Sequence, residues 1–314
     1  MAAFSAANSQ TITTQANYIP EMWSDEIIGA FKANLVLANL VTKIMHNRKK
    51  GDTVHIPVQA RGSASAKAAA ANAVTLITDT ATKKDISINK HFEYSRLIED
   101  MAEIQAIDSY RKFYTDDAGF ALAKQVDTDL HNLGEGLQSG GTTDDTYAAA
   151  VIGSDGSTTF LDASAGNAAA IADAGLRKVI QTLDDADVPL SDRYLIIPPV
   201  EKKSLMGLSR FTEQAFVGEG GPANTIRNGY LGDVYGVPIY VSTNVDSITC
   251  DDTSTVVKSC LLLHRSALGY VEQMGIRSQN QYMQEYLSDL FTADTIYGVS
   301  ELRNDAGIAI IVPS

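Results

Sequence analysis

Apolar residues first recur at helical spacing between residues 18 and 45. Trp23, Ile27, Phe31 and Leu35 follow one another every four positions, and Pro20 with nearby acidic residues suits the start of a helix. This pattern predicts an amphipathic helix. Because no core element precedes it, we expect its apolar side to pack on a later part of the chain or on another chain.

The next apolar positions alternate, which is typical of strands. Val54, Ile56 and Val58 alternate with polar residues, and a second alternating run covers residues 85–95. The segment between the two runs is rich in Ala, Ser and Thr, so its side chains are too small to build a core. The pattern predicts an extended two-stranded arm, which is marginally stable alone in water and needs a neighbour.

A long helical pattern follows from about residue 98 to residue 137. No proline occurs between Pro57 and Pro189 to interrupt it. A helix of ~36 residues would reach ~54 Å, which is long for a compact domain. The apolar positions that define it are Ile107, Tyr110, Tyr114, Ala118, Leu122, Val126, Leu130 and Leu133.

A second region with its own predicted core begins near residue 165. Residues 167–189 predict a helix, residues 193–199 a fully apolar central strand, and a short helix begins at Pro199. Strands are expected for most of the remaining chain, with a hairpin turn at Asn304–Gly307. The residues expected to face inward from the first of these helices are Ile171, Val179, Ile180 and Leu183.

Two glycine-rich stretches raise the question of a phosphate site. Gly218–Ala223 fits the spacing of a dinucleotide fingerprint, but only Phe216 and Val217 precede it, and Pro222 opposes a helix. A flexible loop explains it better. In residues 228–245, no helix follows the glycines to aim N–H groups at an anion. We interpret Gly236 as a turn and Pro238 as the start of a strand.

Candidate chemistry is sparse elsewhere. His91 with Glu93, and His131 with Asp127, would each share a face, but spacing suggests no third metal ligand, so ordinary polar contacts are favoured. The basic run His46–Lys50 suits a helix C-terminus, and could also face nucleic acid or a neighbour's acidic side. The acidic pairs at 144–145, 184–185 and 251–252 are interpreted as solvated turns. We therefore predict no catalytic, cofactor-binding or metal-binding residue.

Composition narrows the class of protein. The 314 residues carry 25 Lys and Arg against 38 Asp and Glu, a net charge of −13, which disfavours a reader of free DNA. Cys250 and Cys260 form no metal or redox motif, so we expect small apolar fillers in a reducing compartment. Neither a signal peptide nor a membrane-spanning run is expected from the sequence.

The order of these parts resembles the major capsid protein of tailed bacteriophages, the Hong Kong 97-like fold that encapsulin shells share. The pieces that carry the resemblance are Tyr18–Val41, Asp85–Asp100 leading into the long helix, Tyr194–Leu208, and Leu231–Val245 with its "GVPIYVS". The resemblance covers nearly the whole chain and rests on the order of the pieces rather than on any one of them.

The resemblance implies an α+β fold with five parts. These are an N-terminal arm and helix (1–46), an extended E-loop (47–95), a P-domain with a spine helix (96–164), an A-domain (165–270), and C-terminal strands returning to the P-domain (271–314). Some family members join a Lys of the E-loop to an Asn of a neighbouring P-domain. Lys67, Lys83 and Lys84 lie in that region, but no partner Asn or catalytic acid can be matched here, so this chemistry is not carried over.

The resemblance also implies partners and a place of action. Many copies would form hexamers and pentamers of an icosahedral shell around packaged double-stranded DNA in the virion, with assembly in the cytoplasm of the host bacterium and no membrane. A separate scaffolding protein, a portal and a decoration protein are the further partners expected. Two alternatives remain: an encapsulin-type compartment with a protein cargo, and a soluble enzyme with an unrecognised site.

Overall fold

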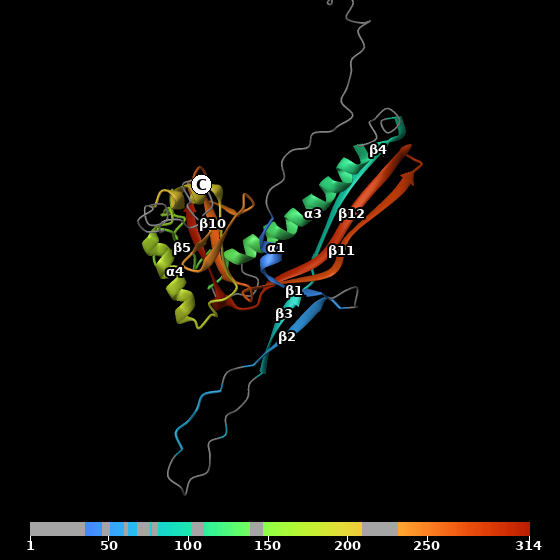
Figure 1. Cartoon of the computed structure of the whole chain (residues 1–314). Coiled ribbons are helices and arrows are strands. Elements are labelled where there is room, and N and C mark those ends of the chain that lie inside the picture. Colours follow the sequence, from blue (N-terminus) through green and yellow to red (C-terminus); the bar gives the residue numbers. More distant parts are fainter. Residues whose placement is uncertain are drawn as a thin grey trace, which may run out of the picture.

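The computed structural model describes most of the chain. Figure 1 shows a long sheet and a long helix at one end, a second sheet with shorter helices at the other, and a two-stranded arm that leaves between them. The described residues are 35–45, 51–59, 62–67, 76, 81–101, 110–138, 147–208 and 232–314.

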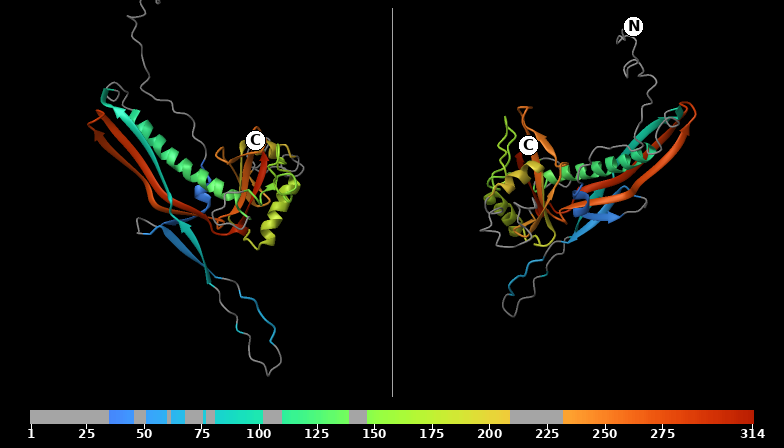
Figure 2. Two further views of the ribbon diagram at one scale, coloured as in Figure 1. Left: turned by 180° about the vertical axis from the view of Figure 1, so that it is seen from behind. Right: turned by 45° about the horizontal axis from the view of Figure 1, so that its top comes forward.

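The long sheet is four-stranded. Its order is β1–β11–β12–β4, with β1 parallel to β11 and the other neighbours antiparallel. Long antiparallel strands give this end of the molecule its extended shape, visible in both views of Figure 2. The bounds are Thr42–Met45 for β1, Lys90–Glu99 for β4, Leu268–Met283 for β11 and Ser288–Glu301 for β12.

The long helix α3 (Tyr110–Glu135) lies along one face of this sheet. Ala118 and Leu122 pack on Phe291 and Ala293, and the pattern of apolar residues predicted for positions 118–133 is confirmed as the buried side. The predicted start at residue 98 is wrong. Ile98 is buried in β4 opposite Asp289, because the strand alternation continues to residue 99.

The second sheet is seven-stranded and holds most of the core. Its order is β5–β13–β10–β6–β8–β7, with β9 also on β10. The predicted central strand is confirmed as β6, between β10 and β8. The bounds are Val151–Ile152 for β5, Arg193–Ile197 for β6, Asp233–Val234 for β7, Val237–Val241 for β8, Ser247–Thr249 for β9, Val256–His264 for β10 and Gly307–Pro313 for β13.

Two helices accompany this sheet as the sequence predicts. Helix α4 (Asp173–Asp185) buries Leu176, Val179 and Leu183, and α5 (Pro199–Met206) begins on a proline whose missing N–H leaves no helical bond unmade. The C-terminal turns of α3 also reach this core. A Cβ on Gly134 would come within 2.6 Å of Leu261 in β10, so the small residue lets the helix approach the sheet.

The last two strands belong to different sheets. The predicted hairpin at Asn304–Gly307 is wrong: a short 3-10 helix, η3 (Asn304–Ala306), carries the chain from β12 to β13. Within the predicted C-terminal part at 271–314, β12 therefore lies in the long sheet, whereas β13 lies in the seven-stranded sheet. Both edges of β12 are taken by β11 and β4, while β13 is buried on both faces and pairs with β10 and β5.

The N-terminal prediction is only partly covered by the structure. Most of the predicted helix at 18–45 lies outside the described residues. Within them, α1 (Leu37–Leu40) is helical, but Thr42–Met45 forms strand β1. Thr42 and Ile44 are β-branched and suit the edge of the sheet beside β11 better than a helix.

The arm consists of β2 (Thr53–Gln59) and β3 (Ala81–Ser87), paired antiparallel from end to end. Figure 1 shows it pointing away from both sheets. The alternating run predicted at 85–95 is interrupted at Ile88 and Asn89, where the chain passes from the arm into β4. The predicted two-stranded arm is thus confirmed, and its second strand is shorter than expected.

The glycine turn is confirmed as a backbone device. Tyr235 and Gly236 join β7 to β8 with φ of 54° and 78°. Two consecutive residues with positive φ are what a tight two-residue hairpin requires, and glycine adopts such a φ without strain. Gly236 therefore shapes the turn ahead of Pro238, as the sequence indicates.

Candidate contact surfaces and the junction of the sheets

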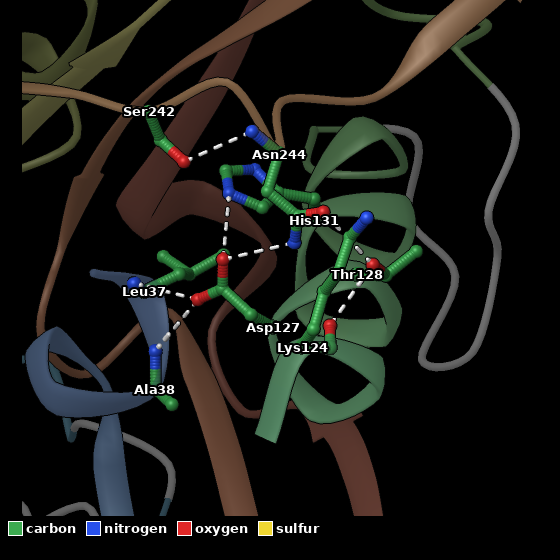
Figure 3. A network of polar contacts seen from close by, with 8 residues as sticks. All are labelled: Leu37, Ala38, Lys124, Asp127, Thr128, His131, Ser242 and Asn244. Atoms are coloured by element: carbon green, nitrogen blue, oxygen red, sulfur yellow. Dashed lines mark hydrogen bonds and ion pairs between the residues drawn. The ribbon is translucent and has the colours of Figure 1, made fainter. Parts of the chain in front are cut away.

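A buried carboxylate joins three parts of the chain near the junction of the two sheets (Figure 3). Asp127 of α3 is fully buried, and its Oδ1 accepts hydrogen bonds from the backbone N–H groups of Leu37 (2.9 Å) and Ala38 (3.4 Å). These N–H groups belong to the first turn of α1, which has no cap from its own preceding residue. Asp127 therefore caps α1 from a distance.

The same carboxylate also holds the segment after β8. Asn244 donates from Nδ2 to Oδ2 of Asp127 over 3.0 Å, and its backbone N–H donates to Oγ of Ser242. The hydroxyl of Thr128 lies within hydrogen-bond distance of two acceptors, Oδ1 of Asn244 and the carbonyl oxygen of Lys124. Helix α3 is thereby tied at one point to α1, which leads into the long sheet, and to a loop of the seven-stranded sheet.

His131 lies one turn along α3 from Asp127, as predicted, and is also buried. Its Nε2 is 3.6 Å from Oδ2 of Asp127, and neither ring nitrogen has a hydrogen-bond partner among the described residues. Burial lowers the pKa of His131, while the charges of Asp127 and Asp246 act in the opposite direction. In the part of the chain that the structure describes, no three His, Cys, Asp or Glu side chains gather as a metal site would require.

His91 makes a structural contact of its own. On the sheet, Arg277 binds Asp294 through two nitrogens at 3.0 and 2.8 Å, and His91 Nε2 lies 3.2 Å from the same carboxylate. The hydrogen bonds from Arg277, and to a lesser extent the contact with His91, lower the pKa of Asp294. The three residues come from β11, β12 and β4, so this cluster ties neighbouring strands together. His91 thus makes an ordinary polar contact, as the sequence favours, and its partner is Asp294.

The exposed arm carries charge across its two strands. Asp85 contacts Nδ1 of His55 at 2.5 Å and Nζ of Lys83 at 3.0 Å. His55, and secondarily Lys83, lowers the pKa of Asp85. Among the lysines singled out by the sequence, Lys83 thus has an ionic partner on its own strand, and Lys84 faces Ile56 in the register of the hairpin.

A group of apolar side chains is exposed at the far end of the long sheet. It comprises Leu97, Met101, Tyr282, Tyr286 and Leu287, from the end of β4 and the turn between β11 and β12. We call it the distal patch. Leu287 is 64% exposed and has a φ of 46°, a region that few residues other than glycine adopt. The exposed apolar side chains and the positive φ of Leu287 make the distal patch a candidate contact surface.

The remaining sequence candidates have ordinary roles or lie outside the described residues. Asp184 forms an ion pair with Arg193, and Asp252 accepts bonds from Ser254 and Thr255, which lower its pKa to about 2. Cys250 and Cys260 are free and buried. The fingerprint-like loop at 218–223, the basic run at 46–50 and the acidic pair at 144–145 are not among the described residues.

Sequence reasoning missed the role of Asp127 as a remote cap. The signal was present: an acidic residue sits within the apolar stripe of a long helix, and a buried carboxylate must be hydrogen-bonded.

None of the described helices has the length and apolar character required to cross a membrane.

Comparisons with known proteins find similarity to phage proteins. The profile that describes the phage capsid protein family matches residues 114–309. Among solved structures, a chain from Mycobacterium phage Che8 is 24% identical, with 94% of this chain and 97% of that chain covered and a TM-score of 0.68. Comparison with curated proteins gives no match.

Two further structures extend the likeness in fold. The capsid of cyanophage P-SCSP1u is 18% identical, with a TM-score of 0.75 over 99% of this chain and 97% of that chain. The capsid of Ralstonia phage GP4 is 15% identical, with a TM-score of 0.70 over 98% of both chains. At these identities the shared property is the fold, which spans nearly the whole of each chain.

Proposed function

The chain belongs to the phage capsid protein family, and from this premise we propose how one subunit contributes to a closed shell. It is a structural protein of the viral capsid and forms the head shell. In the proposal, many copies meet as hexamers and pentamers of an icosahedral shell around the double-stranded DNA of a tailed phage. No step of this function requires catalysis by the subunit.

The observation that carries the proposal is the arm. Strands β2 and β3 pair with one another and reach the body only at their base. A two-stranded ribbon is marginally stable alone in water. It gains partners when it lies on another copy, and repeated contacts between identical subunits close into a shell when their rotations close. Many modest contacts per subunit then make the shell stable.

We assign the parts as follows. Residues 47–89 act as the E-loop, which ends where β4 enters the long sheet, and α3 with the sheet β1–β11–β12–β4 acts as the P-domain. The seven-stranded sheet with α4 and α5 acts as the A-domain near the symmetry axes. We place β13 and β5 in the A-domain and not in the P-domain, because they lie in the sheet that contains β10.

The other partners follow from the same premise. We propose a separate scaffolding protein, a portal and a decoration protein, with assembly in the host cytoplasm. The net charge of −13 supports a wall to which packaged DNA does not adhere. Screening over ~8 Å at physiological salt limits that repulsion to surfaces close to the duplex.

The test is electron microscopy of the purified full chain, alone and with its scaffolding partner. Uniform icosahedral particles are expected, whereas a stable monomer or a small oligomer contradicts the proposal. The contents distinguish the alternatives: nuclease-protected duplex DNA with a portal supports a phage head, and a protein cargo without one indicates an encapsulin-type compartment.

A matched variant isolates the arm. Gln59 and Ala81 are paired at the outer end of the hairpin, so an Asn-Gly turn can replace residues 60–80 without disturbing the register. The shortened chain is expected to keep the thermal unfolding midpoint of the wild type and to lose closed particles. Particles of normal size and yield from this variant would show that the distal arm makes no necessary contact.

A further inference from the structure

The arm leaves the body at a backbone crossing over Gly298. In β12, Gly298 pairs with Val271 of β11, and one residue earlier Tyr297 pairs with Lys90, the first residue of β4. Immediately before Lys90, the chain passes over the face of Gly298. A Cβ placed there would lie 2.4 Å from the carbonyl oxygen of Ser87 and 3.1 Å from Cα of Ile88.

Space, and not backbone conformation, explains this glycine. Gly298 is not among the residues with positive φ, so other residues could adopt its conformation. The atoms that a side chain would meet belong to the backbone, which cannot rotate away as the end of a flexible side chain can. Any larger residue must therefore displace the Ser87–Ile88 crossing, from which strand β3 of the arm departs.

Other contacts hold the same crossing. The side chain of Ile86 is fully buried, although most of the arm is exposed. The N–H of Ile88 donates to the carbonyl of Asp52 over 2.7 Å, and Nε2 of Gln273 donates to the carbonyl of Gly51 over 3.0 Å. The first bond joins the two sides of the arm base to each other, and the second joins the segment before β2 to β11 of the long sheet.

A hollow lies between the arm base and α3. An open polar hollow of about 450 Å³ borders the crossing there, lined by residues that include Ser87, Asn89, Lys90, Asp129 and Asn132. Tyr297 points toward α3, where its hydroxyl donates to Asp129, so the neighbouring Gly298 faces the other side of the sheet. The crossing therefore rests on the face of β12 that α3 does not cover.

We propose that Gly298 is the pivot that sets the direction of the arm in the subunit before assembly. The inference rests on the proposed function, because the direction matters only if the arm contacts another copy. An arm that is already aimed loses less conformational freedom when it binds, which lowers the cost of each contact in the shell. Gly298 is a positioning residue: it acts through the Ser87–Ile88 crossing.

The test compares Gly298→Ala with Gly275→Ala. Gly275 is a matched control in β11, since a Cβ there meets only the end of the Glu272 side chain, which can move. Each full-length variant also carries Val58→Cys on the arm and Leu190→Cys in the seven-stranded body, for spin labels. Both positions are exposed, whereas the native Cys250 and Cys260 are buried.

Electron spin distance measurements then report the direction of the arm. In unassembled wild-type chains, a single narrow distance distribution is expected, and the same distance in assembled particles. Gly298→Ala shifts or broadens this distribution and loses closed particles, while Gly275→Ala matches the wild type in both. The thermal unfolding midpoint shows whether the Gly298 variant is folded.

Several results would overturn the inference. One is a broad wild-type distribution that narrows only in particles, since neighbours would then aim the arm. Another is a Gly298→Ala chain with the distances and particles of the control. If that variant does not fold, Gln273→Ala is measured instead, because it removes a bond at the arm base that does not involve Gly298. An unchanged distribution supports the pivot, and a broadened one overturns it by showing that the bond to Gly51 aims the arm.

The test separates this inference from the proposed function. Failure of the wild-type chain to form particles with its scaffolding partner would count against the function. The distances in unassembled chains would still decide whether the fold aims the arm.

Discussion

Replacement of Asp127 by alanine should weaken the junction between α1, α3 and the loop after β8. The carboxylate is fully buried and accepts bonds from Leu37 N–H, Ala38 N–H and Asn244 Nδ2 at 2.9, 3.4 and 3.0 Å. Asp127→Ala leaves these donors without their acceptor. The Ala38 bond is long, so two bonds of full strength are lost.

The magnitude follows from those two bonds. A hydrogen bond to a charged group contributes about 1.5–3 kcal/mol, and loss of a helix cap about 1 kcal/mol. Removing the buried carboxylate also removes its desolvation cost, which offsets part of the loss. We expect the free energy of unfolding to fall by about 2–4 kcal/mol.

The assay is denaturant unfolding of the unassembled chain, followed by far-ultraviolet circular dichroism. Glu285→Ala is the control, since Glu285 is an exposed acid in the turn after β11 and should change stability by less than about 0.5 kcal/mol. Limited trypsin digestion adds a local measurement: cleavage after Lys43, just beyond α1, should quicken in Asp127→Ala. Equal stability and equal cleavage in the two variants would refute the role assigned to Asp127.

Three other changes test the fold and the distal patch. Gly119→Ala should raise the free energy of unfolding by roughly 0.5–1 kcal/mol, because a Cβ there meets nothing within 4 Å and alanine favours the helix; a lower melting temperature would contradict this. Because burial lowers the pKa of His131, the unfolded chain binds a proton at this residue more readily than the folded chain, so the free energy of unfolding falls as the pH drops below the unfolded pKa of about 6.5. His131→Gln should therefore flatten the dependence of the unfolding free energy on pH between about 5 and 7, and an unchanged slope would exclude His131 as its source. Leu287→Gly should stabilise the subunit by up to about 1 kcal/mol, because it relieves a positive φ, yet lower the yield of particles, because it removes an exposed apolar contact; full yield by sedimentation would count against the distal patch.

Local patterns account for the parts of the fold that the sequence predicts correctly. The arm follows from strict alternation around a segment too small to form a core, and α3 from a long helical stripe. The order of α4, β6 and α5 follows from an amphipathic helix, a short fully apolar strand and a proline at a helix start. Each of these signals lies within about one element of chain.

Choices between distant partners account for the errors. Strands β12 and β13 are both rich in apolar residues, and nothing local in either states that β13 must pair with β10. Likewise, a glycine inside a strand predicts a close approach, but not that the approaching segment is the Ser87–Ile88 crossing, more than two hundred residues earlier. Ile98 fits both a helical stripe and the strand alternation of β4, and only its pairing with Asp289 of β12 decides for the strand.

One turn of α3 contacts both the base of the arm and the junction of the two sheets. Asp129 of α3 accepts a hydrogen bond from the hydroxyl of Tyr297 at 2.6 Å and contacts Nζ of Lys90 at 3.1 Å, while Asp127, two residues earlier, holds α1 and Asn244. Tyr297 directly precedes Gly298, and Lys90 is where the chain from the arm enters the long sheet. Through Asp129 this turn of α3 contacts Tyr297, next to the pivot, and through Asp127 it contacts the loop of the seven-stranded sheet. The direction of the arm and the position of that sheet are therefore both fixed relative to one short length of helix. If the pivot acts as proposed, the angle between the arm and the body is set inside the subunit. It then depends on a few backbone contacts at Gly298 and not on the amino-acid composition of the arm.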